Sequence, residues 1–534
     1  MKGKSILVIG ILGAVLSFST IFAAPKERIT ISKLHKTPEF ISGRLTTVSD
    51  KEPQEIVFDY LDSNRDRFKF SSEKSNNSFK ILSQHKDSLG YTYLRLQQLY
   101  KGLPVFGSTQ TAHINERGEL TSFSGAVIPN IDKQKSLKFD EEVEAKEAIE
   151  IAEKDLGFKP KYEIMPTCEL VIYPCGEKII DVYLVRLKFA KPQTGNWYYF
   201  IDPSSGEVVH KFNSIHDRSV PSKGEGRIEL GIRALENIEE INNFSSPSQY
   251  YLYRAGKKDI KIYDEENKYF ILRGKIPKMI WKERCNSSIN LYASATSYDA
   301  IIHDYCLNTL ERHSFDKKDT KIQPRPHYSS NNGGWPGYKM IYGNPESFRE
   351  LSRGIDVVAH ELTHVVTKHR ANLIYENESG AINRAMSDIF GAVVEFYANN
   401  DPDWLLKENI CTPNIDGDTI RSMSDPTVCG YPDHYGDRYR GAKDNGGVNR
   451  NSSIINKAAY LISNGGTHYG VTINGIGMDK MASIFYRALT QHLTQSSTFS
   501  QLRAALVQSA TELYGGRGVE VQAIEAAFDS VGIQ

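Results

Sequence analysis

The alternation of apolar and polar positions divides this chain into a strand-rich first part and a helical last part. Between residues 91 and 201, short alternating runs are separated by turn residues, which is the pattern of half-buried strands. An acidic helix is expected over residues 139–156, so the first part predicts an α+β fold. The expected strands are 91–96, 102–107, 112–114, 182–189 and 197–201, with turns at 116–118 and 202–206.

From residue 356 onward, apolar residues recur every three to four positions, which predicts a mainly helical region. The stretch 227–354 has the pattern of strands and loops, with one helix near 293–310. A chain of 534 residues is too long for one core, so we expect several domains. The expected helices are 356–370, 381–399, 449–464, 478–494, 499–513 and 519–531.

The first 24 residues predict a secretory signal. Lys2 and Lys4 precede an apolar stretch over 6–22, and Ala23 and Ala24 are the small residues typical of a cleavage site. A membrane anchor is the alternative, but glycines and serines interrupt the stretch, and no later run reaches the ~20 apolar residues of a spanning helix. We therefore expect a secreted, extracellular protein with no membrane anchor after signal removal.

Charge and cysteine content narrow the partners and the compartment. Lys+Arg and Asp+Glu both total 65, and this balance argues against binding to nucleic acid or to an anionic membrane. Six cysteines fit an oxidising destination. Neighbouring positions suggest the pairs Cys168–Cys175, Cys285–Cys306 and Cys411–Cys429, although the sequence does not choose among the pairings that six cysteines allow.

A metal-binding helix is expected at residues 356–370. His360 and His364 are four residues apart, so they share one helical face and can bind one ion. Glu361 lies beside that position, where a carboxylate can act as a general base. The flanking residues are apolar, which predicts that the helix is largely buried. Two buried imidazoles need a partner or a function, and this weakens the alternative of a chance motif.

Several segments resemble the thermolysin family of secreted bacterial neutral metalloendopeptidases. They are 356–364, 377–383, 421–426, 444–448 and 465–470. Residues 97–107 resemble the propeptide module of that family, and residues 137–212 resemble a PepSY module. A polar stretch over 216–226 is expected to be a linker and processing region.

The resemblance implies a domain order for the whole chain. After a signal peptide (1–24) it predicts a fungalysin/thermolysin-type propeptide (25–135) and a PepSY-like propeptide (136–215). A thermolysin-like unit of two lobes follows, with an active-site cleft between them. Its β-rich N-terminal lobe with the metal helix spans 216–374, and its mainly helical C-terminal lobe spans 375–534.

The family reaction implied by the resemblance is zinc-dependent hydrolysis of peptide bonds on the amino side of bulky apolar residues. His360 and His364 match zinc ligands, and Glu361 matches the catalytic carboxylate. Asp388 matches a carboxylate that orients a metal-bound histidine. The other matched positions are Tyr375, which steadies the oxyanion, Asp444, which supports a transition-state histidine, and Asn332 and Arg421, which hold the substrate backbone.

The resemblance also implies bound calcium. Oxygen ligands in this density suit calcium, and the alternative is a solvated acidic patch. Cys411 and Cys429 border the second of the two expected sites. The matched ligands are Asp356, Glu395, Asp403 and Glu408 for a double site, and Thr412 and Asp418 for part of another.

Two positions depart from the family pattern. Arg384 stands where the third zinc ligand should be a glutamate, and Asn449 stands where the transition-state histidine is expected. Arginine is always cationic and has no lone pair for a metal. Loss of a group that stabilises an oxyanion costs about 2.7–4 kcal/mol, although the Asn449 amide can still donate a hydrogen bond.

The spacing of Arg384, Asp388 and Glu395 places them on one helical face. We predict that the Arg384 guanidinium occupies the zinc position and pairs with Glu361 or Asp388. In the alternative, Arg384 turns to solvent and zinc binds weakly to the two histidines, with Asp388 as a further ligand.

Two functions fit these residues. One is an active secreted zinc endopeptidase, made as a zymogen with an inhibitory propeptide. The other is a catalytically inactive relative that binds peptides or a protein partner in the old cleft, and the two departures favour it. The expected partners are peptide or protein substrates or ligands and the chain's own propeptide.

Overall fold

The computed structural model describes residues 27–69, 74–133, 143–162, 164–176, 178–192, 195–215, 355–399, 403–406 and 419–534. Between residues 241 and 343 it describes short strands alone. The expected linker at 216–226 and helix near 293–310 lie outside the described residues. So do four predicted site residues, Asn332, Glu408, Thr412 and Asp418.

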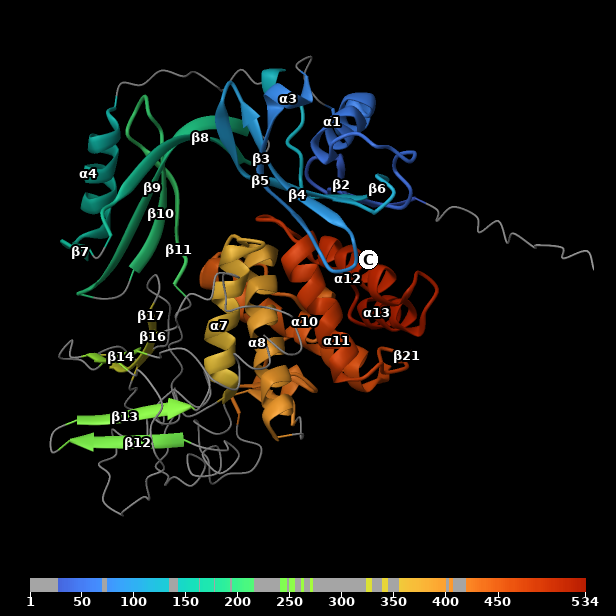
Figure 1. Ribbon diagram of the computed structural model, residues 1–534. Coiled ribbons are helices and arrows are strands. Elements are labelled where there is room, and N and C mark those ends of the chain that lie inside the picture. Colours follow the sequence, from blue (N-terminus) through green and yellow to red (C-terminus); the bar gives the residue numbers. More distant parts are fainter. Residues whose placement is uncertain are drawn as a thin grey trace, which may run out of the picture.

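An 11-stranded sheet forms the first part of the molecule and arches over the helices of the last part (Figure 1). Strands β3 (Phe79–Lys86) and β4 (Thr92–Tyr100) extend it beside β5, and β7 (Lys161–Tyr162) pairs with β9. The main path runs β1 (Arg28–Ile31), β2 (Pro38–Ser42), β6 (Leu120–Ser124), β5 (Leu103–Ile114), β8 (Thr167–Cys175), β9 (Lys178–Lys191), β10 (Gly195–Ile201) and β11 (Val208–Asn213).

The sheet has two halves, each with its own core. One parallel residue pair, Val105 with Ile172, joins them. The first half packs α1 (Pro53–Ser63) on one apolar cluster, and the second packs α4 (Ala145–Leu156) on another. This division lies near the predicted module boundary at residue 135, and the PepSY-like nature of the second half stays a prediction. The shorter helices here are α2 (Arg65–Phe68), α3 (Ser75–Ser78) and η1 (Ile131–Lys133).

The predicted strands of this part are confirmed, with one correction. Residues 102–107 and 112–114 were expected to be two strands, but both belong to the single strand β5. The residues between them, 108–111, are polar by type yet buried, so the alternation rule does not mark them as a strand. The turn at 116–118 is present, with Gly118 in the left-handed region at φ 71°.

The six predicted helices are confirmed, and their starts differ in two places. The second begins at residue 377 rather than 381, and the third begins at 443 because a left-handed turn at 444–447 precedes its regular part. The helices are α7 (Ile355–His369), α8 (Asn377–Asn399), α10 (Lys443–Asn464), α11 (Met478–Arg487) continued by the π-turn η5 (Ala488–His492), α12 (Phe499–Tyr514) and α13 (Val519–Ser530).

Short strand pairs and 3-10 turns complete the described chain. None of the described helices has the length and apolar character needed to cross a membrane. The pairs are β12 (Ile241–Ser246) with β13 (Gln249–Arg254), β14 (Lys261–Tyr263) with β15 (Tyr269–Ile271), β16 (Gln323–Tyr328) with β17 (Lys339–Gly343), β18 (Leu405–Leu406) with β19 (Arg421–Ser422) and β20 (Gly466–His468) with β21 (Val471–Ile473), and the turns are η3 (Pro426–Cys429) and η4 (Tyr435–Asp437).

The first half of the sheet docks on the helical part through both apolar and polar contacts. Phe40 of β2 is buried within the core of the helical part. The loop between η5 and α12 bonds to β5, because the Ser496 hydroxyl donates to the Gly107 carbonyl at 2.7 Å and the Gln495 amide donates to the Thr109 hydroxyl at 3.2 Å. Residues separated by almost 400 positions in sequence therefore form one interface.

The suggested disulfide between Cys168 and Cys175 is wrong. Both residues lie on strand β8, and neither is bonded to another cysteine. A strand rises about 3.3 Å per residue, so seven residues separate the two Cα atoms by roughly 23 Å, whereas a disulfide needs less than about 7 Å. Cys285, Cys306 and Cys411 lie outside the described residues, so the other two pairings stay predictions.

Helices α7 and α8 approach so closely that one crossing point requires glycine. A Cβ atom on Gly391 would lie 2.9 Å from the backbone oxygen of Asp356. We expect Gly391→Ala to lower stability by about 1–3 kcal/mol, because a backbone atom must move to accommodate it. The measurement is the denaturant midpoint of unfolding. Gly516→Ala is the control, since its nearest neighbour is the Thr511 methyl at 3.2 Å. Equal losses in the two variants would contradict the close approach.

Candidate active site

The two histidines of the expected metal helix lie as that role requires. His360 and His364 are buried on α7, one turn apart, and their Nε2 atoms are 3.0 Å from each other. A tetrahedral zinc with bonds of ~2.0–2.1 Å separates two ligand nitrogens by about 3.3 Å. The imidazole pair therefore fits two positions of a zinc site.

The outer nitrogen of each ring has its own polar partner on α8. His360 Nδ1 lies 3.0 Å from Asp388 Oδ1, and His364 Nδ1 lies 2.7 Å from Asn383 Oδ1. The Asn383 amide nitrogen faces the Leu373 carbonyl at 3.4 Å, so its oxygen faces the ring. Both Nδ1 atoms then act as donors, and both Nε2 lone pairs point toward each other. That arrangement favours a cation between them, either a proton or a metal.

The residue at the expected third ligand position is a buried arginine. Arg384 is 1 % exposed, so the alternative in which it turns to solvent is wrong. Its Nε lies 3.9 Å from Asp388 Oδ1, which is ion-pair range but too long for a hydrogen bond. Among the described residues, Arg384 Nε and Nη2 have no hydrogen-bond partner. The guanidinium is thus held inside the site, and its occupation of the metal position stays a prediction.

Asp388 connects the metal helix to the rest of the site. Its Oδ2 accepts hydrogen bonds from Arg421 Nη1 and, at 3.0 Å, from Asn456 Nδ2. Burial opposes the charge on Arg421, but Asp388 outweighs it and raises the Arg421 pKa. Arg421 was expected to hold the substrate backbone, and in this structure its guanidinium is engaged by internal partners, with Nη2 donating to the Asn449 carbonyl at 3.0 Å.

Asn449 is fixed from both sides. Its Nδ2 donates to Asp444 Oδ1 at 2.5 Å, and its Oδ1 accepts from Arg421 Nη2 at 3.3 Å. Asp444 also accepts from the Asn449 backbone amide at 2.7 Å, because the left-handed turn at 444–447 directs it back onto the helix. One amide N–H of Asn449 is therefore already used by Asp444, which reduces what it can offer to an oxyanion.

The start of α8 links the site to the end of the sheet. Tyr375 is buried, and its ring lies edge-on to His364 with the centroids 6.2 Å apart. Asn445 Nδ2 donates to the Tyr375 carbonyl at 3.1 Å and to the carbonyl of Asn213, the last residue of β11, at 2.9 Å. Glu361 is buried on α7 beside the two histidines.

The structure describes three of the six expected calcium ligands. Asp356 and Glu395 are buried on α7 and α8, while Asp403 is exposed and accepts the Leu405 amide at 2.8 Å. Gly391 and Glu395 share a face of α8, and Gly391 touches the Asp356 backbone, so the two buried carboxylates belong to one side of the helix pair. The remaining ligands are not described, and the site stays a prediction.

Sequence reasoning did not assign roles to Asn383, Asn445 or Asn456. Asn383 lies in a quoted family segment, and its spacing of five residues from Asp388 gives a weak signal that both serve the histidines. Asn445 also lies in a segment that resembles the family, and Asn456 does not, but the spacing of neither residue indicates its role, because their partners come from distant segments of the chain.

Comparison with known proteins defines the class. Residues 229–368 match the family described as Thermolysin metallopeptidase, catalytic domain, and residues 371–533 match Thermolysin metallopeptidase, alpha-helical domain. Residues 77–127 match the Fungalysin/Thermolysin Propeptide Motif. The site therefore lies in a thermolysin-type metalloendopeptidase unit with a propeptide, and the predicted two-lobed α+β fold is confirmed.

Relatives that match over nearly the full length of the chain belong to the same family. The chain is 43% identical to "Bacillolysin" from Bacillus cereus, with 100% of each chain covered, and 42% identical to "Thermolysin" from Alicyclobacillus acidocaldarius, with 96% of each covered. A solved "Precursor of Protealysin" from Serratia proteamaculans matches at 27% identity with a TM-score of 0.44, over 52% of this chain and 88% of that one. This chain belongs to the thermolysin metallopeptidase family.

Proposed function

We propose that this chain is a secreted thermolysin-type proprotein whose peptidase site does not hold catalytic zinc, so that peptide hydrolysis is lost or severely weakened. The observation that carries the proposal is the buried Arg384, whose Nε lies 3.9 Å from the carboxylate that also contacts His360. A site with two imidazoles and a fixed cation has an incomplete set of zinc ligands.

The charge of Arg384 supports this proposal. Two unit charges about 4 Å apart cost about 4 kcal/mol at an effective dielectric of 20, and a zinc ion carries two charges. Asp388 does not remove this cost, because its two oxygens already serve His360 and Arg421. The proton that can lie between the two Nε2 atoms is then the smaller cation that satisfies the histidines.

A second function, peptide binding without cleavage, is favoured by the same arginine. Buried guanidinium donors without acceptors cost more than about 1–3 kcal/mol, so Arg384 Nε and Nη2 favour an anionic partner. We propose that a ligand of this cleft supplies a carboxylate, either the end of a peptide or an acidic side chain. Calcium at Asp356, Glu395 and Asp403 would then maintain the scaffold that presents this cleft.

The test is the effect of the imidazole pair on metal content. Zinc per chain, measured by mass spectrometry in the purified full chain, should be the same for the unchanged chain and for His360→Ala/His364→Ala, with calcium as the internal control. The chain should also keep its propeptide, and Glu361→Gln should not alter its processing. Loss of one zinc per chain in the double variant, or self-cleavage abolished by Glu361→Gln, would refute the proposal.

A further inference from the structure

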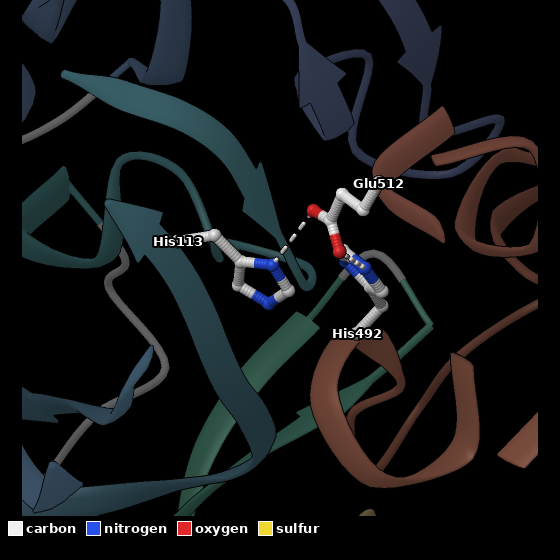
Figure 2. A group of neighbouring side chains, drawn as sticks. All are labelled: His113, His492 and Glu512. Atoms are coloured by element: carbon white, nitrogen blue, oxygen red, sulfur yellow. Dashed lines mark hydrogen bonds and ion pairs between the residues drawn. The ribbon is translucent and has the colours of Figure 1, made fainter. Parts of the chain in front are cut away.

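A buried cluster of two histidines and a glutamate lies where the sheet meets the helical lobe (Figure 2). His113 comes from β5 in the propeptide, whereas His492 ends η5 and Glu512 lies on α12 of the peptidase unit. The side chains of His113 and His492 are fully buried, and that of Glu512 is 1 % exposed. Among the described residues, this is the group whose ligand atoms lie within 4.8 Å of one another.

Both histidines turn a nitrogen toward the same carboxylate. His113 Nδ1 lies 3.3 Å from Glu512 Oε1, and His492 Nε2 lies 3.3 Å from Glu512 Oε2. Figure 2 shows the two rings on one side of Glu512, with both dashed contacts ending on its oxygens. The carboxylate is itself oriented, since Gln508 donates to Oε1 at 3.0 Å and Arg487 donates to Oε2 at 2.6 Å.

His113 turns one ring nitrogen toward a backbone carbonyl and the other toward a carboxylate. Its Nε2 lies 3.1 Å from the Gln491 carbonyl, and a carbonyl only accepts, so Nε2 carries the proton. In the neutral ring, Nδ1 is then an acceptor facing Glu512.

The charges of the cluster also call for a cation. Glu512 and Asp87 each carry −1 and Arg487, which bonds to both, carries +1, so these three side chains leave one negative charge beside the two imidazoles. Tyr93 bonds to Asp87 and Arg487 as a neutral phenol, because burial raises its pKa. A buried net charge is costly unless a counter-ion neutralises it.

The distance between the imidazole nitrogens and the carboxylate oxygens distinguishes a bound metal from a shared proton. A proton shared between imidazole and carboxylate gives a charge-assisted hydrogen bond of about 2.7–2.9 Å. Two ligands of a tetrahedral zinc with bonds of about 2.0–2.2 Å lie roughly 3.3 Å apart. Each histidine has that separation from one oxygen of Glu512, and one ligand atom from each of the three residues lies within 4.8 Å of the others.

We propose that His113, His492 and Glu512 form a zinc-class metal site that clamps the propeptide to the helical lobe of the peptidase unit. The site takes a borderline divalent ion that accepts nitrogen and oxygen ligands. The proposal rests on the assignment of residues 77–127 to the propeptide. It does not depend on whether His360 and His364 hold a metal. Removal of the propeptide takes His113 away and leaves two ligands, so metal release and propeptide release are coupled.

The outer ring nitrogens of the two histidines differ in their hydrogen bonds. The outer nitrogen of His113 donates to the Gln491 carbonyl, as metal-bound histidines require. The outer nitrogen of His492, Nδ1, has no hydrogen-bond partner among the described residues. We therefore expect exchangeable metal that a chelator removes. At a free metal concentration about 100 times the Kd, retention of the propeptide should be about 100-fold stronger than without metal.

The test uses the full chain carrying His360→Ala/His364→Ala, so that the catalytic pair contributes no metal. We expect one zinc per chain, loss of that zinc in the further variants His113→Gln and Glu512→Gln, and no loss in His85→Gln. His85 is the matched control, because it also comes from the propeptide and lies 3.0 Å from Gln491 without being a ligand. Cobalt substitution should give the visible absorption of a tetrahedral site.

A second measurement keeps the test decisive if a ligand variant does not fold. In the same background, a zinc chelator with calcium in excess should speed tryptic removal of the propeptide, and added zinc should reverse this. Absence of zinc from the background chain, or equal zinc in His113→Gln and His85→Gln, would overturn the proposal. Propeptide retention that is indifferent to zinc but weakens as pH rises would also overturn it, since it would identify a protonated His113 as the cation.

Discussion

The double variant Arg384→Glu/Asn449→His should gain one zinc per chain and cleave peptides on the amino side of bulky apolar residues. The introduced carboxylate supplies a third ligand to the two imidazoles, whose Nε2 atoms already converge at 3.0 Å. The introduced imidazole should contribute roughly 10²–10³ in rate, as expected for a group that stabilises an oxyanion. The measurements are zinc content by mass spectrometry and kcat/KM on a short peptide.

Three controls isolate the cause of the gain. Arg384→Gln removes the buried cation but adds no zinc ligand, so it should restore neither full zinc content nor activity. Adding Glu361→Gln to the double variant should abolish cleavage while the new zinc remains. Adding His364→Ala should remove that zinc. A folded double variant with added zinc and no cleavage would show that the loss of function extends beyond these two positions.

The helical half was predictable from sequence because its signals are local. A period of three to four residues located α7, α8 and α10 to α13, and the four-residue spacing of His360 and His364 placed both on one face. The same rule placed Arg384 and Asp388 together on α8, and both are buried there. What the period could not give was the direction of the Arg384 side chain, because solvent and the site interior are both within reach of a long side chain.

The clusters that join the modules were not predictable. His113 and Glu512 are 399 positions apart, and neither lies in a motif with a recognised spacing. Strand β5 was split in the prediction because its polar residues 108–111 are buried by the interface with the helical lobe rather than exposed. A rule based on local alternation reads such a surface as a loop, since the partner that buries it comes from elsewhere in the chain.

Acid should weaken the protein through the same cluster. In metal-free protein, burial and His113 lower the His492 pKa to about 3, whereas an unfolded histidine titrates near 6.5. The histidine partners also hold the Glu512 pKa well below its usual value, despite the opposing effect of burial. The unfolded chain therefore binds more protons than the native chain between about pH 6.5 and 3, and stability falls as pH falls through that range.

The contribution of His492 to the pH dependence of stability can be measured by comparing the unchanged chain with a variant that lacks this histidine. Each unit of pKa shift corresponds to about 1.36 kcal/mol, so His492 alone should account for roughly 2–4 kcal/mol of the stability lost between pH 7.5 and 4. His492→Gln should remove that share of the pH dependence in urea unfolding with chelator present, while His85→Gln should leave it intact. Added zinc should steepen the dependence further, because protons then compete with the metal for both imidazoles. Parallel pH profiles for the unchanged chain and His492→Gln would mean that this histidine is not held neutral at the interface.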